Sequence, residues 1–295
     1  MIAFGCAITK PAVYERCALP GIRRAAEADS VVDAGPAAGS IFASYNALLD
    51  RAAAREDLEA LVVVHQDAEL MTPGFPAILR EALRDPAAGV VGCVGAVGVR
   101  SIAWWEGSVT LASFVNRYAA HGGGDLESFS WDPATAPPWT RTGEVETLDG
   151  FVIAFTPWAI ANVRFDEGLE SRFHGYDLDY CLQVREAGRK VLTAPFRAVH
   201  HREIEMLPDP EDWIAAHIAV AEKWDGRMPG IGTGPGTWRE RALRAEADRD
   251  LARAIAHSKV LELEAKAAEL RRAVEITRRS LSWRLTAPLR RGAAR

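Results

Sequence analysis

The chain lacks several features that would assign it to a common protein class. No apolar run among its 295 residues approaches the roughly 20 that a membrane-spanning helix needs. Residues 1–5 contain no basic segment of the kind that opens a signal peptide, so we expect neither a membrane span nor a secretory leader. The net charge of -5 also argues against nucleic-acid binding, which requires a basic surface.

Cysteine is scarce and scattered. The four cysteines, Cys6, Cys17, Cys93 and Cys181, stand far apart, and no pair has the spacing of a metal site. We expect them to be reduced side chains of the core in a cytosolic protein. The 295 residues are enough for one domain and an appendage, and the 48% apolar and 25% charged residues are typical of a chain with a substantial core.

Strand-like and helix-like segments alternate along the first hundred residues. Strands are predicted at 2–9, 30–33, 61–64 and 90–99, and helices at 12–28, 40–53 and 73–84. The run at 61–64 is apolar throughout, as in a strand that is buried on both faces. This alternation predicts an α/β fold with a mostly parallel, Rossmann-like sheet flanked by helices.

The regular pattern dissolves between residues 102 and 145. This segment contains four tryptophans, Trp104, Trp105, Trp131 and Trp139, and long irregular segments of compact domains often form lids or binding loops. Strand character returns at 148–155. A further helix is predicted from Asp209, as its cap, to residue 224.

Acidic residues follow two of the predicted strands. Asp33 ends the strand at 30–33, and His65-Gln66-Asp67 follows the strand at 61–64. A carboxylate at the C-terminal edge of a parallel strand lies where such folds bind ligands, and a divalent cation on a diphosphate takes one or two such oxygens. Asp67 could equally cap a turn. Asp149-Gly150 is likewise a common turn pair that opens a strand.

The most informative stretch is residues 173–182, Phe-His-Gly-Tyr-Asp-Leu-Asp-Tyr-Cys-Leu. Asp177 and Asp179 begin a helical run that Gly188 is well placed to end. Both acids could simply complement the helix dipole, and because they point to different sides of the helix only one would face a cleft. The pair His200-His201 follows the next strand, where imidazole is either a solvated strand end or a metal ligand.

Taken in order, these motifs resemble those of family 2 glycosyltransferases of the GT-A type, and most closely a bacterial subgroup with a His-Gln-Asp metal motif. The resemblance covers residues 2–228. The matching pieces are Ser44-Tyr45-Asn46, His65-Gln66-Asp67, Leu148-Asp149-Gly150-Phe151, Gly175-Tyr176-Asp177-Leu178-Asp179, His200-His201 and Lys223-Trp224. It implies an inverting enzyme of the hexosyltransferase type that moves a sugar from a nucleotide-diphosphate donor to a glycan or polysaccharide-type acceptor.

The resemblance also implies roles for single residues. Asp67 would bind Mn²⁺ or Mg²⁺ on the donor diphosphate, with His200 or its neighbour His201 as a late metal ligand. Asp33 would read the nucleotide base, and Asp177 would be the catalytic base.

Further residues are implied on the donor and acceptor sides. Asp149 would lie near the donor sugar or the acceptor. The donor site would include His65, Gln66 and Gly150, and the acceptor side Trp104, Trp105, His174, Tyr176 and Asp179.

Two alternatives remain open at this stage. His65 and Tyr176 stand where the family has acids, which favours a catalytically inactive binding or assembly module. A sugar nucleotidyltransferase would need a glycine-rich basic loop after the first strand, and residues 7–11 offer none.

The C-terminal quarter reads as an appendage to a catalytic domain at 1–229. A glycine-rich linker is predicted at 230–238, a helix at 239–282 and a basic amphipathic tail at 283–295, which is similar to a segment near the ends of bacterial polysaccharide glycosyltransferases. Apolar residues at heptad spacing allow a short coiled coil. The helix is either simply solvated, or it forms a homo-oligomer or docks on the inner face of a membrane through Trp283 and the terminal arginines.

Overall fold

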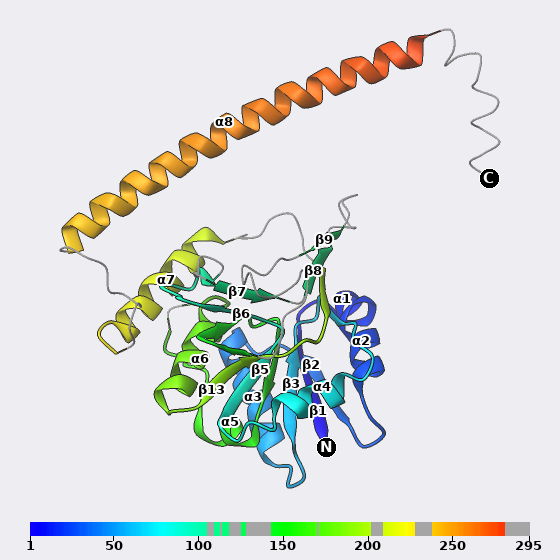
Figure 1. Ribbon diagram of the computed structural model, residues 1–295, viewed down its shortest axis with the longest axis vertical. Helices are drawn as coiled ribbons and strands as arrows, with labels where there is room; N and C mark the ends of the chain where they lie inside the picture. Colours follow the sequence, from blue (N-terminus) through cyan, green and yellow to red (C-terminus); the bar gives the residue numbers. More distant parts are fainter. Residues whose placement is uncertain are drawn as a thin grey trace. The chain divides into compact units, whose positions relative to one another are not determined.

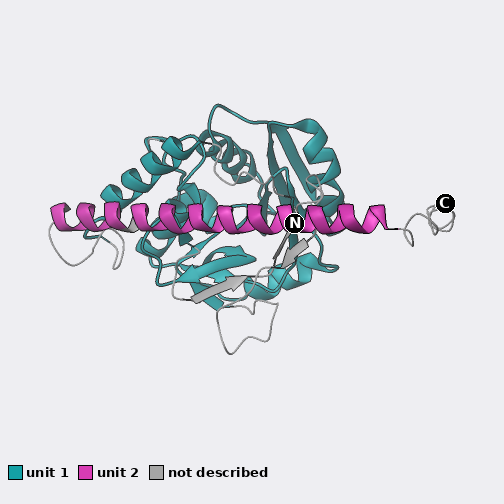
Figure 2. Ribbon diagram, turned by 90° about the horizontal axis from the view of Figure 1, so that it is seen from above, with its two compact units in different colours: residues 1–233 teal, residues 234–295 magenta. Residues whose placement is uncertain are grey.

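The computed structural model describes residues 1–104, 109–112, 114–117, 125–127, 143–169, 171–201, 209–227 and 238–280. The chain divides into two units, Met1–Thr233 and Gly234–Arg295 (Figure 2). The described part of the second unit is one helix, α8 (Trp238–Arg279). This agrees with the predicted helix at 239–282. The predicted linker, apart from Trp238, and the basic tail lie outside the described residues. No helix in the described ranges is long and apolar enough to cross a membrane.

The first unit is built around a seven-stranded sheet (Figure 1). In spatial order its strands are β10 (Gly143–Val145), β13 (Lys190–Thr193), β5 (Ala88–Gly92), β12 (Val152–Phe155), β3 (Ala60–Val64), β1 (Ile2–Ile8) and β2 (Val31–Pro36). β1 is parallel to β2 and β3, and β13 is parallel to β5. β12 is antiparallel to β3 and β5, and β10 is antiparallel to β13. The other five strands therefore run in one direction, which confirms the mostly parallel sheet.

Helices cover both faces of this sheet, because alternate side chains of each strand point to opposite sides. In β3, Val62 and Val64 belong to a core shared with α2 and α4, whereas Leu61 and Val63 belong to a core shared with α3, α5 and α6. The helices of unit 1 in the described ranges are α1 (Pro11–Arg16), α2 (Ala18–Ala25), α3 (Ile41–Ala53), α4 (Phe75–Ala82), α5 (Pro157–Asn162), α6 (Tyr176–Glu186) and α7 (Pro210–Trp224). All four cysteines are free and buried, as predicted.

Two smaller sheets complete the unit. One has the order β4 (Ala68–Leu70), β14 (Ala198–His201), β8 (Phe114–Arg117) and β9 (Asp125–Glu127), and the other β11 (Thr147–Leu148), β6 (Val94–Val97) and β7 (Val109–Ala112). The segment at 102–145 was predicted to be irregular, yet it contains β7, β8, β9 and β10. These strands are three or four residues long, which is too short for a clear alternating pattern.

Helix ends follow their local chemistry, while three predicted elements are divided. Gly188 has a φ of 76° just after α6, and the side chain of Asp209 accepts a hydrogen bond from the backbone of Asp212 at the start of α7. The helix predicted at 12–28 is two helices that meet at Cys17. The strand predicted at 90–99 parts at Cys93 into β5 and β6, because each joins a different sheet. The strand predicted at 148–155 falls into β11, which ends at Leu148, and β12, which begins at Val152.

Candidate functional site

The candidate site begins where β3 ends. His65 follows the last residue of β3, and its backbone N–H donates to the carbonyl of Phe151 at 2.8 Å. This contact arises because β12 lies antiparallel to β3, with Val152 opposite Val64. The antiparallel strand therefore brings the Asp149-Gly150 turn to the same edge of the sheet as His65.

A second antiparallel pairing brings the late histidines to Asp67. β14 pairs with β4 so that His200 lies opposite Ala68, and the backbone N–H of His201 donates to the carbonyl of Asp67 at 2.8 Å. Neighbouring side chains of a strand point to opposite faces, so only one histidine can face Asp67. That histidine is His200, while His201 pairs with Glu69 at 3.3 Å.

The three side chains form what we call the His-Asp-His group, made of His65, Asp67 and His200. One possible ligand atom from each lies within 4.8 Å of the other two. Nδ1 of His65 is 3.9 Å from one carboxylate oxygen of Asp67, and Nε2 of His200 is 3.6 Å from the other. The ring of His200 stacks on Phe151 at 4.8 Å with an interplanar angle of 7°, which fixes its orientation.

The electrostatics of this group keep the carboxyl group of Asp67 ionised. Burial by itself would raise the pKa of Asp67, but the close approach and charge of His200, followed by the charge of His65, outweigh burial and hold the pKa well below its ordinary value. Nδ1 of His200 is buried without a hydrogen-bond partner among the described residues. Two imidazoles and one carboxylate are a donor set that suits divalent transition metals such as Mn²⁺.

Gln66 has a different role from its neighbours. Its side-chain carbonyl accepts hydrogen bonds from the backbone N–H groups of Thr9 at 3.0 Å and Lys10 at 2.8 Å, and its amide donates to the Thr9 hydroxyl at 2.7 Å. Gln66 therefore ties the loop after β1 to the end of β3. A direct contact between Gln66 and the donor stays a prediction.

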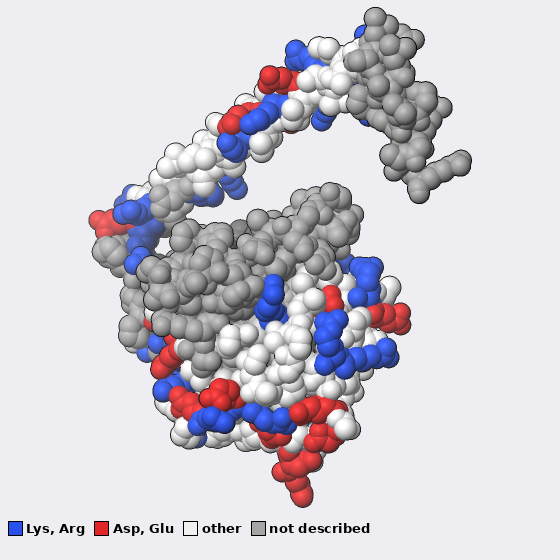
Figure 3. All heavy atoms as spheres, turned by 45° about the vertical axis from the view of Figure 1, so that its right-hand side comes forward, with Lys and Arg blue, Asp and Glu red and all other residues white. Residues whose placement is uncertain are grey.

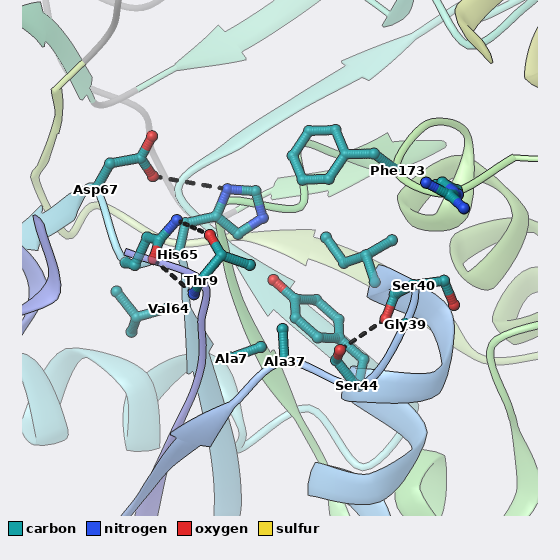
Figure 4. A pocket seen from close by; sticks show the side chains of 14 residues that line it. Ala7, Thr9, Ala37, Gly39, Ser40, Ser44, Val64, His65, Asp67 and Phe173 are labelled. Carbon is teal, nitrogen blue, oxygen red and sulfur yellow. Dashed lines mark hydrogen bonds and ion pairs between the residues drawn. The ribbon is translucent and has the colours of Figure 1, made fainter. Parts of the chain in front are cut away.

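A cavity of about 360 Å³ lies beside the group (Figure 4). Its walls include His65, Gln66, Asp67 and Phe173, together with residues that the sequence did not single out: Thr9, Ser40 and Arg172. Ser40 caps α3 by accepting a hydrogen bond from Ala43, so the N-terminus of a 13-residue helix meets the cavity. The N–H of Ile41 already donates to the carbonyl of Arg172 and that of Ala43 to Ser40, so the terminus offers an anion mainly its dipole, to which Arg172 adds a positive side chain.

Asp177 lies at the start of α6 and is bound to the Asp149-Gly150 turn. One carboxylate oxygen accepts from the backbone N–H of Gly150 at 3.0 Å, and the other from Leu178 at 2.9 Å. Burial, followed by the charge of Asp149, raises the pKa of Asp177 to about 7. A carboxyl group with this pKa can accept and return a proton near neutral pH.

Tyr176 connects this turn to the His-Asp-His group. Its hydroxyl forms a 2.9 Å hydrogen bond with Nε2 of His65. The same hydroxyl passes so close to Gly150 that a Cβ added there would lie 2.0 Å from it. Position 150 therefore requires glycine for as long as Tyr176 keeps this place.

Two acids expected in the site have other partners. Asp33 forms a 2.8 Å ion pair with Arg51 and, like Asp149 and Asp177, is not among the described residues that line the cavity. Asp179 is fully buried, accepts from the indole N–H of Trp224 at 2.8 Å and pairs with Lys223 at 2.8 Å. These contacts give Asp179 a structural role between α6 and α7, and we leave it out of the acceptor side.

The remaining acceptor predictions divide between described and undescribed residues. Burial lowers the pKa of His174 below its ordinary value, which favours a neutral ring. Trp104 is partly buried and packs against both cores of the sheet. Trp105 lies outside the described residues, as do Trp131 and Trp139. An acceptor role for His174 and for these tryptophans stays a prediction.

Comparison with known proteins gives three findings. A family model described as "Glycosyltransferase like family" matches residues 13–213. The streptomycin biosynthesis protein StrF of Streptomyces griseus is 31% identical over 215 residues, which cover 72% of this chain and 71% of StrF. The crystal structure of GalNAc-T7 with UDP, GalNAc and Mn²⁺ is 9% identical, with a TM-score of 0.50 over 76% of this chain and 48% of that one. This last likeness concerns the fold alone.

Proposed function

Because the chain belongs to the glycosyltransferase-like family and has the GT-A fold, we propose that it transfers a sugar from a nucleotide-diphosphate donor to a glycan acceptor, with inversion at the anomeric carbon. The observation that supports this most directly is the His-Asp-His group beside a cavity. Metal ligands, a helix N-terminus and Arg172 together suit the diphosphate of such a donor.

The metal would be held by Asp67 and His200, with His65 as the third ligand. When bound, the ion offsets the negative charge that builds on the departing nucleoside diphosphate. Either Mn²⁺ or Mg²⁺ satisfies the carboxylate. The two imidazoles favour Mn²⁺, because Mg²⁺ prefers oxygen ligands.

Asp177 would act as the base. Its carboxylate takes the proton of the acceptor hydroxyl as that oxygen attacks the anomeric carbon, while the bond from that carbon to the diphosphate oxygen breaks. Attack from the side opposite the leaving group inverts the configuration. Asp149, whose charge helps to raise the pKa of Asp177, would lie near the donor sugar or the acceptor.

The acceptor is open between two chemical classes. The tail motif suggests a polysaccharide-type acceptor, whereas the name of StrF assigns that relative to streptomycin biosynthesis and suggests a small glycoside. Trp104 and Trp105 would offer aromatic faces to either sugar. Assays with both classes of acceptor decide between them.

The competing proposal is a binding or assembly module without turnover. It draws its support from His65 and Tyr176, which replace two acids. The hydrogen bond between them argues against simple loss of function, because it joins Tyr176 to a side chain of the His-Asp-His group. Donor binding without sugar transfer would favour the module.

The experiment that tests the donor site is a calorimetric titration of UDP, GDP and dTDP with and without Mn²⁺. We expect one nucleotide to bind in a metal-dependent manner, and Asp67→Ala to abolish this. Asp50→Ala is the matched control, since Asp50 is an exposed acid that pairs with Arg164 and does not line the cavity. A folded protein that binds no nucleotide would contradict the proposal.

For the second unit we propose that α8 pairs with α8 of a second copy. Its seam consists of Ala256, Val260, Leu263, Ala267, Leu270 and Val274, at alternating spacings of four and three residues. The four larger members are 49–62% exposed within one chain. β-Branched residues at one seam position and leucine at the other favour a parallel two-stranded coiled coil.

Charge along the helix is compatible with this pairing. Figure 3 shows Lys and Arg interspersed with Asp and Glu along α8. In a parallel pair, Lys259 of one copy flanks the seam next to Glu264 of the other, which is favourable, whereas the same register places Lys266 next to Arg271, which is not. The apolar seam, and not charge, therefore supports the pairing. Sedimentation tests the proposal: the double variant Leu263→Glu, Leu270→Glu should be monomeric. Leu251→Glu, which is equally exposed but lies on the opposite side, should not change the mass. A monomeric wild type would contradict it.

We also propose that the protein acts in the cytoplasm, at the inner face of the membrane. Four free cysteines and the expected nucleotide-sugar donor support the compartment. Membrane contact would come from the tail at 283–295, which lies outside the described residues. Flotation with anionic liposomes, with and without residues 283–295, tests this contact, and unchanged flotation would remove it.

A further inference from the structure

Tyr176, the first residue of α6, forms a hydrogen bond with a side chain of the His-Asp-His group. The bond joins its hydroxyl to Nε2 of His65 at 2.9 Å, and both side chains are largely buried, with Tyr176 at 5% exposure. The other ring nitrogen of His65, Nδ1, is the atom on the side of Asp67. The two nitrogens of the His65 imidazole therefore have different partners: Nε2 bonds to the hydroxyl of Tyr176, and Nδ1 faces the carboxylate of Asp67.

The chemistry of imidazole restricts how these tasks combine. A neutral ring has one N–H and one lone pair, and a metal ligand must present the lone pair to the ion. If Nε2 carries the proton and donates it to the hydroxyl of Tyr176, then Nδ1 is left as the ligand atom. A hydrogen bond at Nε2 thus selects the tautomer and holds the plane of the ring.

From this geometry we infer that Tyr176 is a positioning residue, which holds the His65 ring so that Nδ1 is presented to a divalent cation shared with Asp67 and His200. The inference depends on the proposed function, since it concerns the same metal. It gives the two departures from the family pattern one joint explanation, in which His65 supplies a ligand and Tyr176 orients it.

The surroundings of Tyr176 leave its ring little freedom. Its ring packs edge-on against Tyr45 at 5.5 Å and Phe42 at 6.2 Å, and its hydroxyl passes directly over Gly150, where a Cβ would lie 2.0 Å away. The hydroxyl is therefore fixed in place before any metal binds. Such fixed partners of a ligating histidine commonly change metal affinity by about 10- to 100-fold when removed.

The chain provides a matched control in Tyr45. This tyrosine is also buried next to His65, with ring centroids 6.3 Å apart, but its hydroxyl interacts with that of Tyr176 rather than with a nitrogen of His65. Tyr176→Phe and Tyr45→Phe each remove one buried hydroxyl and keep the ring. A general effect of losing a hydroxyl in this core would appear in both variants.

The test is a titration of each full-length protein with Mn²⁺ alone. The concentration of free Mn²⁺ at each step is measured from its electron paramagnetic resonance signal. We expect Tyr176→Phe to raise the Kd for Mn²⁺ at least tenfold, and Tyr45→Phe to leave it within twofold of wild type. In a His65→Ala background, Tyr176→Phe should have no further effect, because its target is gone. Circular dichroism of each variant checks that the fold is retained.

The outcomes separate the inference from the proposed function. Equal Mn²⁺ affinity in wild type and Tyr176→Phe would overturn the positioning role and leave the metal site standing. An equally large loss from Tyr176→Phe in the His65→Ala background would also overturn it. A wild type that binds no Mn²⁺ would overturn the metal site and the inference together.

Discussion

Nε2 of His200 lies 3.6 Å from the carboxylate of Asp67, although the two residues come from distant parts of the chain. The contact exists because β14 runs antiparallel to β4, which directly follows Asp67. Around it, His65 and Tyr176 connect the end of β3 to the start of α6. The proposed metal group and the proposed base are thus assembled at one edge of the central sheet.

His200 and His201 provide a direct comparison of two neighbouring imidazoles. His200→Ala removes one of three proposed ligands and should weaken Mn²⁺ binding at least tenfold. His201→Ala should have little effect, because His201 pairs with Glu69 instead. Calorimetric titration with Mn²⁺ measures both. A larger loss in His201→Ala would mean that the ligand had been assigned to the wrong histidine.

Asp177→Asn should remove the base while keeping the bond to Gly150, since the amide oxygen can still accept it. We expect turnover to fall by about 10² to 10⁴ and nucleotide affinity to stay unchanged. In the wild type, kcat/KM should rise with pH through about 7, because the base works only when ionised. A pH profile that is flat between 5.5 and 8 (roughly one unit or more on each side of that value) would contradict the assignment.

The pKa of Asp177 also predicts how stability changes with pH. Because it is raised from 3.8 in the unfolded chain to about 7 in the fold, the folded state binds the proton more tightly. Ionisation therefore opposes folding, with no effect below pH 3.8 and an effect that grows until the pH passes 7. Asp177→Asn should gain stability relative to wild type over this interval, as measured by thermal unfolding. If the difference in Tm between the two proteins did not change with pH over this interval, the prediction would be refuted.

Asp179 should matter for stability, in contrast to Asp177. Asp179→Ala leaves Lys223 and the indole of Trp224 without their buried partner, and we expect a loss of about 3–5 kcal/mol in the free energy of unfolding. Asp166→Ala, which removes a more exposed partner of the same lysine, should cost no more than about 1 kcal/mol. Urea unfolding measures the free energy of unfolding of both variants. Equal losses would show that the burial of Asp179 does not account for its effect on stability.

Much of the architecture could be predicted from local pattern. Fully apolar strands such as β3 indicate a sheet covered on both faces, and acids after them mark its ligand-binding edge. Asp209 and Gly188 identified helix ends because a cap depends on one residue and its immediate neighbours. The position of His65 and Asp67 at that edge follows from the strand-end rule, whereas the place of Asp177 was implied only by the family resemblance.

The rest depends on contacts between distant segments. The spacing of apolar residues does not predict that β12 lies between β3 and β5, or that β14 pairs with β4. These pairings nevertheless bring Gly150 and His200 to the site. Asp33 was predicted to end its strand, but β2 continues to Pro36, and Asp33 pairs with Arg51 instead. The cavity wall at Arg172 and Phe173 comes from a loop whose sequence alone does not say which surface it covers.

The central claim is sugar transfer with Asp177 as the base, and its most direct test is release of nucleoside diphosphate from a panel of nucleotide sugars. The reactions contain Mn²⁺ and a mixture of polysaccharide fragments and small glycosides. We expect release from one donor by the wild type, at least about a hundredfold slower release by Asp177→Asn, and equal nucleotide binding by both. Equal rates in the two proteins, or nucleotide binding without any release, would contradict it.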